Sequence, residues 1–259
     1  MEEIPIAFIG DTFSRLPTDT VGDLDALPDV YSRTAKKRCE NAHDLYIFLS
    51  PDSAYFRLDP GISLLDWTKK SKIDSVFLGD VSQFPGSLQH LDLLSADLLN
   101  ALLHILRTSQ YLLDEFRIDE FPRVTRITHD QLIRQVLDAI PAVANFCAGD
   151  RKVDYREFLK KPIKYIEMYV KTPRSLMPAM RNKVEDPQLD YLVLNYSSKH
   201  QVFFESLLVA LEKFNGGHID LSKHVKPFVK RRKLFQGPNW RVTYDRPASD
   251  KLSMIFRKL

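Results

Sequence analysis

The sequence predicts an α/β fold in which strands and helices alternate around a mostly parallel sheet. The first observation is a series of short runs rich in β-branched and aromatic residues: SVFLG (75–79), EFRID (115–119), ANFCA (144–148), YIEMYV (165–170), DYLVLNY (190–196), GHIDL (217–221) and WRVTY (240–244). The second is a set of helical runs between many of them, at 96–113, 129–140 and 201–214. Such alternation is typical of parallel sheets, because each helix carries the chain back to the start of the next strand.

The spacing of these units is the next feature. From the third run onward the centres lie about 20 to 30 residues apart, which is the period of a leucine-rich-repeat-like solenoid. The regular LxxLxLxxN signature is absent apart from a partial match at LDYLVLNY. We therefore expect an irregular, leucine-rich-repeat-like α/β domain over residues 64–259. An α/β layer without repeats would explain the alternation equally well.

Residues 43–63 are expected to connect this domain to what precedes it. LYIFLS (45–50) is typical of a strand, and the Pro, Asp and Gly residues that follow it are typical of a turn or linker. Lys69, Lys70 and Lys72, beside Trp67, are expected in a solvated turn.

The first 42 residues predict a small helical module. In the second part of this segment Val21, Leu24, Leu27, Tyr31 and Ala35 follow one another at spacings of 3, 3, 4 and 4, as on one side of a helix. Pro17 and Pro28 interrupt the helical pattern. The segment therefore predicts three short helices, near 5–16, 18–26 and 28–39.

This segment resembles an F-box. The family pattern of a Leu-Pro pair, two apolar positions, a second Leu-Pro pair, apolar positions three apart and a Trp followed by Ala is matched in register by Ile4-Pro5, Phe8, Phe13, Leu16-Pro17, Val21, Leu24, Leu27, Tyr31 and Ala35. The departures are Ile4 for the first Leu, Thr20 where Asp is frequent, and Tyr31 for Trp. The resemblance covers about 40 of the 259 residues. The order of F-box, connecting strand and degenerate helix–strand units also resembles the expanded F-box families of nematodes.

The resemblance implies an adaptor without catalytic activity or cofactor. An F-box binds a Skp-family linker protein, which attaches it to a cullin-based ubiquitin ligase, while the C-terminal domain selects a target protein. Carried over position by position, the residues implied to form or support the linker-binding surface are Ile4, Pro5, Phe8, Phe13, Leu16, Pro17, Val21, Leu24, Leu27 and Tyr31. The alternative is a helical cap that only covers the following domain.

Charge is distributed unevenly along the chain. Residues 150–259 hold 23 basic and 12 acidic residues (net +11), against 14 and 22 in residues 1–149 (net −8). A basic C-terminal half is expected to bind an acidic protein or nucleic acid in preference to a basic partner. The residues proposed for this contact are Lys226, Lys230, Arg231, Arg232 and Lys233. They alternate with Phe228, Phe235 and Trp240, which are also typical core residues of a last helix–strand unit with a solvated basic rim.

One enzymatic alternative stays open. IAFIGD (6–11) and VFLGD (76–80) each end in Gly-Asp, as strands of α/β enzymes do where a carboxylate binds a metal. Asp11 and Asp80 are therefore the candidate ligands of a metal-dependent phosphoester hydrolase. Phosphate-loop, dinucleotide, serine-hydrolase and zincin motifs are absent.

The chain is expected to act in the cytoplasm, the nucleus or both. Its acidic start, MEEIPIAFIGD, differs from a signal peptide, and no apolar run is long enough to span a membrane. Cys39 and Cys147 are the only cysteines, so neither a disulfide scaffold nor a structural zinc site is predicted.

Overall fold

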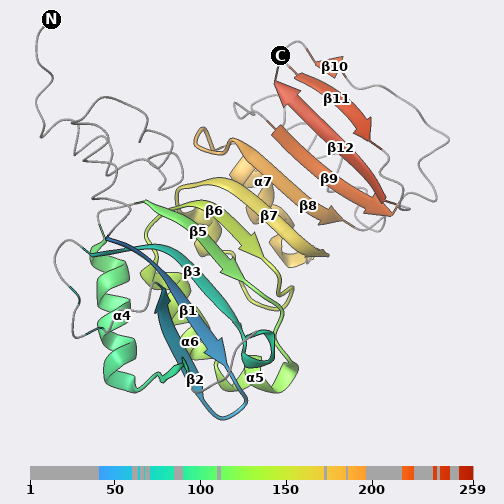
Figure 1. Ribbon diagram of the computed structural model, residues 1–259. Coiled ribbons are helices and arrows are strands. Elements are labelled where there is room, and N and C mark those ends of the chain that lie inside the picture. Colours follow the sequence, from blue (N-terminus) through green and yellow to red (C-terminus); the bar gives the residue numbers. More distant parts are fainter. Residues whose placement is uncertain are drawn as a thin grey trace, which may run out of the picture. The chain divides into compact units, whose positions relative to one another are not determined.

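Strands and helices alternate along the described part of the chain, as the sequence predicts (Figure 1). The computed structural model describes residues 41–59, 64, 67, 71–84, 90–109, 112–171, 174–184, 186–196, 218–224, 236–237, 240–245 and 251–258. The predicted F-box-like module at 1–42 lies almost wholly outside these residues, and the predicted helix at 201–214 lies entirely outside them.

The strands in chain order are β1 (Ala42–Leu49), β2 (Ala54–Asp59), β3 (Lys72–Asp80), β4 (Asp92–Leu93), β5 (Leu113–Ile118), β6 (Val143–Ala148), β7 (Ile163–Lys171), β8 (Tyr191–Tyr196), β9 (His218–His224), β10 (Gln236–Gly237), β11 (Trp240–Asp245) and β12 (Lys251–Lys258). The α-helices are α4 (Ala96–Thr108), α5 (Arg123–Thr128), α6 (Asp130–Ala139) and α7 (Met177–Val184), with short 3-10 helices η3 (Val81–Gln83), η5 (Phe158–Lys160) and η6 (Arg174–Leu176).

The chain divides into two compact units, Met1–Ala144 and Asn145–Leu259, and the boundary falls within β6. In the first unit the strand order is β5-β3-β1-β2-β4. Here β1 is parallel to β3 and β3 to β5, whereas β2 is antiparallel to both β1 and β4. This confirms the predicted α/β class. The strands that alternate with helices pair in parallel. The sheet is mixed, because antiparallel strands extend it.

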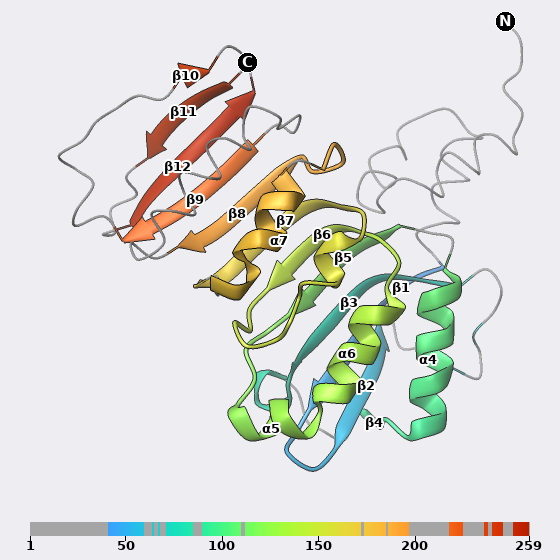
Figure 2. The ribbon, with the colours of Figure 1, turned by 180° about the vertical axis from the view of Figure 1, so that it is seen from behind.

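Helices cover one face of the first unit's sheet. Strand β1 alternates strictly, with Leu45, Ile47 and Leu49 at most 1% exposed and the residues between them half-buried. α4 and α6 contact each other over this apolar face (Figure 2). In Figure 1 the molecule is seen from the other side, where β1 and β3 lie in front of α6. Strands in sequential order with right-handed crossovers place their helices on the same face.

Local capping defines the ends of α4. The Ser95 hydroxyl accepts a hydrogen bond from the Leu98 N–H at 3.3 Å, and the buried side of the helix consists of Leu102, Leu103 and Leu106. The sequence predicts a helix to residue 113, but α4 ends at Thr108. Ser109 is already extended, with φ −60° and ψ 121°, because the chain must reach the start of β5 within a few residues.

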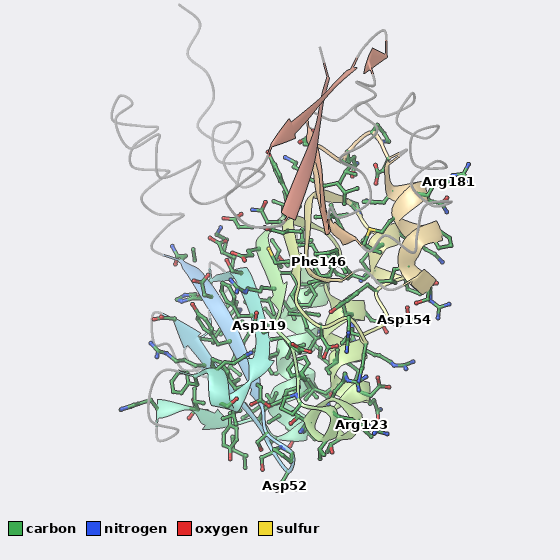
Figure 3. All side chains as sticks on the ribbon, turned by 90° about the vertical axis from the view of Figure 1, so that its right-hand side faces the viewer. Asp52, Asp119, Arg123, Phe146, Asp154 and Arg181 are labelled. Carbon is green, nitrogen blue, oxygen red and sulfur yellow. The ribbon has the colours of Figure 1, made fainter. Side chains whose placement is uncertain are left out.

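In the second unit, the strand order is β6-β7-β8-β9-β12-β11-β10. β7, β8 and β9 are parallel neighbours, and β12, β11 and β10 continue the sheet in antiparallel pairing. Phe146, labelled in Figure 3, lies in the core, with ring centroids 5.4 Å from Tyr155 and 4.7 Å from Phe158. The Tyr155 hydroxyl donates to the Asp150 carbonyl at 2.8 Å, so this buried phenol has its hydrogen-bond partner.

Two local expectations need correction. The strand expected within residues 43–63 is present as β1, but the linker expected after it contains β2, which forms a hairpin with β1, and β1 also pairs with β3. Residues 42–49 and 54–59 therefore belong to the sheet. Lys72 was predicted in a solvated turn, yet it begins β3, is 4% exposed and forms an ion pair with Asp74.

Candidate functional site

The half-buried face of the first unit's sheet carries the most distinctive group of side chains among the described residues. Side chains on a strand alternate between the two faces, so burying Leu45, Ile47 and Leu49 under the helices places Asp44, Tyr46 and Phe48 on the opposite face. In β3, burial of Val76 and Leu78 does the same for Ser75 and Phe77. We call this the open face, and it comprises Asp44, Tyr46, Phe48, Tyr55, Arg57, Asp59, Ser75, Phe77, Phe84, Glu115, Arg117 and Asp119.

Aromatic rings form the middle of the open face. Tyr46 and Phe77 are direct partners in the parallel ladder, and their rings stack at 4.7 Å with planes 14° apart. Phe48 lies 6.2 Å from Tyr46 and 5.0 Å from Phe84, measured between ring centroids. All four side chains are half-buried. Large apolar rings that stay partly exposed are typical of protein-binding surfaces.

The strand register arranges the charged residues in rows across the sheet. The first row contains Asp59, Asp44, Ser75 and Glu115, and the second contains Arg57, Tyr46, Phe77 and Arg117. An arginine therefore flanks the aromatic pair on each side. In the first row, Ser75 lies between Asp44 and Glu115, and Asp59 lies beyond Asp44.

Both arginines are paired with a carboxylate two residues further along the chain. Arg57 lies 3.3 Å from Asp59, and Arg117 lies 3.0 Å from Asp119. Within the described residues, Asp44 and Glu115 form no ion pair. The open face therefore has more acidic than basic side chains, and the excess lies in the first row.

Burial and the neighbouring carboxylates both raise pKa values on the open face. Burial raises the pKa of Asp44, and the charges of Asp74 and Asp59 raise it further, against a hydrogen bond from Ser75 that lowers it. Burial also raises the pKa of Tyr46, and the carboxylates of Asp44, Asp59 and Glu115 add to this shift, while Arg57 opposes it. Three carboxylates therefore act on the position of the Tyr46 hydroxyl.

Polar residues also meet at the carboxyl ends of β1 and β3. Figure 3 labels Asp52, in the turn after β1, and Arg123, at the start of α5, which lie toward the same end of the unit. His129 Nε2 lies 2.7 Å from the Ser50 carbonyl oxygen, so this nitrogen carries the proton and donates. This contact joins the α5–α6 junction to the end of β1.

Asp80 is the one candidate metal ligand of the hydrolase alternative that lies among the described residues, and it caps η3. Its Oδ1 accepts from the Ser82 N–H at 3.0 Å and from the Ser82 hydroxyl at 2.5 Å, and its Oδ2 accepts from the Thr125 hydroxyl at 3.3 Å. The Gln83 side chain returns to accept from the Asp80 N–H at 3.2 Å, which completes a capping box. Both carboxylate oxygens thus bind protein donors.

The other predicted site residues lie outside the described residues. These are Asp11, the ten residues implied to bind a linker protein, and Lys226, Lys230, Arg231, Arg232 and Lys233. Among described side chains, no group of three or more His, Cys, Asp and Glu is arranged to hold a metal ion. None of the helices in the described part of the chain is long and apolar enough to cross a membrane.

The open face was not identified from the sequence. The alternation in LYIFLS and SVFLG does place Tyr46, Phe48 and Phe77 at every second position, which is a usable signal. What it lacks is the register that sets residue 46 beside residue 77.

Comparison of the chain with protein-family models, with curated proteins and with solved structures gives no match.

Proposed function

We propose that this chain is a substrate-recognition adaptor of a cullin-based ubiquitin ligase. In this proposal residues 1–42 bind a Skp-family linker protein, and the α/β domain binds a target protein. The α/β domain would be an irregular, leucine-rich-repeat-like one. The chain itself performs no chemistry and needs no cofactor. Its place of action would be the cytoplasm or the nucleus.

The observation that carries the target-binding half is the open face. Sheets of parallel strands are usually covered on both faces, yet the described helices of the first unit cover only one. The other face has stacked aromatic rings and flanking arginines, residue types that are enriched in protein interfaces. A partner protein that covers this face would bury the rings completely.

The linker-binding half rests on the F-box-like pattern of the sequence. Its anchors in the proposal are Leu16, Leu24 and Tyr31, because interfaces of this kind depend on a few buried apolar side chains. The basic residues 226–233 remain a proposed contact for an acidic target. Nucleic acid remains the alternative ligand for that segment.

The hydrolase alternative finds no specific support in the described residues. A carboxylate whose two oxygens already accept three hydrogen bonds from Ser82 and Thr125 has a structural explanation as a helix cap. Metal binding by Asp80 would have to compete with these donors.

Binding of purified full-length chain to a purified Skp-family linker tests the proposal. A variant with Leu16→Asp, Leu24→Asp and Tyr31→Ala should lose co-elution with the linker in size-exclusion chromatography, while its circular dichroism spectrum stays that of the wild type. The matched control is Arg231→Gln with Arg232→Gln, which should bind the linker normally. Absence of binding by folded wild-type chain, or unchanged binding by the triple variant, would refute the linker assignment.

A further inference from the structure

The first row of the open face has a chemical preference that the adaptor role does not specify. Asp44 and Glu115 lie on β1 and β5, with Ser75 of β3 between them. Neighbouring strands are about 4.8 Å apart, so these two carboxylates originate from positions about 10 Å apart across the sheet. The side chain between them, Ser75, is small and hydrogen bonds to the Asp44 carboxylate, and the space considered for a ligand group is the one above it.

A cation suits this space. The ammonium group of lysine or the guanidinium group of arginine is long enough to contact carboxylates on both sides, and it would reduce the mutual repulsion of Asp44, Asp59 and Glu115. Phosphate or another anion would meet only added repulsion there. Charge complementarity therefore selects a basic group.

The adjacent row explains why the ligand should be a side chain and not a free ion. Tyr46 and Phe77 lie two residues further along their strands, about 7 Å from the first row. Their stacked rings offer an apolar surface to the methylene stem of a lysine or arginine. An extended segment with basic side chains can use both rows at once.

We propose that the open face binds an extended, basic segment of a partner protein, with one lysine or arginine above Ser75 between Asp44 and Glu115 and its stem over Tyr46 and Phe77. Identification of this partner with the ligase target rests on the proposed function. The chemistry by which the open face would bind a basic segment does not depend on that function.

The charge of the first 149 residues supports the same partner. Residues 1–149 hold 22 acidic and 14 basic residues (net −8), and a field of this sign accelerates the approach of a basic partner. The first unit thus prefers the opposite ligand charge to that of the basic segment at 226–233.

A defined peptide tests the proposal. The probe is a short fluorescein-labelled peptide of alternating threonine and arginine, compared with a version in which glutamine replaces every arginine, by fluorescence anisotropy on full-length chain. We expect the arginine peptide alone to bind, with an affinity that falls as salt is raised. Asp44→Asn with Glu115→Gln should weaken this binding about tenfold or more.

Two variants control for folding and net charge. Asp97→Asn with Asp138→Asn removes two exposed carboxylates from α4 and α6, on the covered side, and should leave peptide affinity unchanged. Ser75→Arg fills the space with a cation of the chain itself while both carboxylates remain. It should abolish peptide binding and raise the thermal unfolding midpoint, so it keeps the test valid if the double carboxylate variant does not fold.

Three results would overturn the proposal. Failure of the folded wild-type chain to bind the arginine peptide is the first, and equal loss of affinity in both double variants is the second. The third is binding that appears only after Arg231→Gln and Arg232→Gln, which would make the chain's own basic segment the occupant. Co-elution of the chain with a Skp-family linker is measured in parallel. Its outcome does not depend on these three results, so it tests the proposed function separately.

Discussion

Tyr46 of β1 and Phe77 of β3 are direct partners in a parallel ladder, with ring centroids 4.7 Å apart and planes inclined by 14°. The two residues come from strands that are separated in the sequence by β2. Their stacking therefore couples the first strand of the sheet to the third, on the face opposite the helices.

A double-mutant cycle should measure this coupling. We expect Tyr46→Leu and Phe77→Leu together to cost about 0.5 to 1.5 kcal/mol less than the sum of the single changes, the usual range for an aromatic pair. Urea denaturation gives the free energies. Tyr46→Leu combined with Val124→Ala, an exposed position of α5, should be additive, and additivity of the Tyr46–Phe77 pair would contradict the interaction.

The contribution of the Asp44 carboxyl group to the stability of the folded state should be less favourable at neutral pH, where it is charged, than at acid pH, where it is protonated. Burial, Asp74 and Asp59 hold its pKa above the ordinary value of 3.8, although a hydrogen bond from Ser75 opposes them. Between these two pKa values the folded state binds more protons than the unfolded state, so the free energy of unfolding falls as pH rises through this window. Above the raised pKa the loss is complete.

Asp44→Asn removes that loss and should stabilise the chain at pH 7 by up to about 0.5 kcal/mol, since the site is only partly buried. Its advantage over the wild type should shrink as pH falls toward 3.8. Ser75→Ala removes the hydrogen bond that favours the charged form and should shift stability in the opposite direction at pH 7. Thermal unfolding midpoints of the wild type and both variants, measured from pH 3 to pH 8, test these expectations. A difference between Asp44→Asn and the wild type that does not change with pH would contradict them.

Lys183 and Asp186 form a partly buried ion pair in the second unit, in which the Asp186 side chain is 25% exposed. The Lys183 side chain is 2% exposed, and its ammonium donates to Asp186 and, at 2.7 Å, to the Lys161 carbonyl. Lys183→Met retains the stem but leaves both acceptors without this donor, so we expect a loss of about 1 to 3 kcal/mol. Lys160→Met breaks the exposed Lys160–Glu157 pair and should cost less than about 0.5 kcal/mol.

The same pair predicts an acid-sensitive step. Burial acts to raise the pKa of Asp186, but hydrogen bonds from Lys183 and the Gln188 N–H outweigh it and lower the pKa below 3.8. This contribution to stability is present above 3.8 and is lost as pH falls through the lowered value. Lys183→Met should therefore flatten the acid limb of the stability profile. Equal costs for Lys183→Met and Lys160→Met would show that burial of the pair is unimportant.

The capping role of Asp80 predicts how its variants behave. Asp80→Ala removes the acceptors for Ser82 and Thr125 and should cost about 1 to 2 kcal/mol, whereas Asp80→Asn keeps an acceptor oxygen and should cost less. Addition of Mg²⁺ or Mn²⁺ should leave the unfolding midpoint of the wild type unchanged. A midpoint that rises with Mn²⁺ in the wild type and not in Asp80→Asn would favour the metal-site alternative.

Residue patterns predicted the strands of the parallel part well, because those strands have buried apolar residues at fixed periods. β3, β5, β6, β7, β8 and β9 all lie where the runs predict them. β2 was missed because its alternation, AYFRLD, lies between Pro51 and Pro60, and prolines so close together are typical of a linker. α7 was missed because MPAMRNKV is only eight residues long and carries a proline in its first turn.

The open face could be predicted only in part. Alternation places Tyr46 and Phe77 on one side of their strands, and the charge count shows that the first 149 residues are acidic. Neither observation sets Ser75 between Asp44 and Glu115, because that neighbourhood depends on the register of three strands. Register is determined by packing of the whole sheet against its helices, which no local window contains.

The shortest strand of the first unit has a consequence for aggregation. β4 consists of Asp92 and Leu93 alone and is the last strand on its side of the sheet, next to β2. Among the described residues, an edge strand of two residues offers few unpaired backbone groups to another chain, and the charged Asp92 opposes further pairing. Self-association by strand addition at this edge is thereby discouraged, even though β1 and β2 are long and rich in aromatic residues.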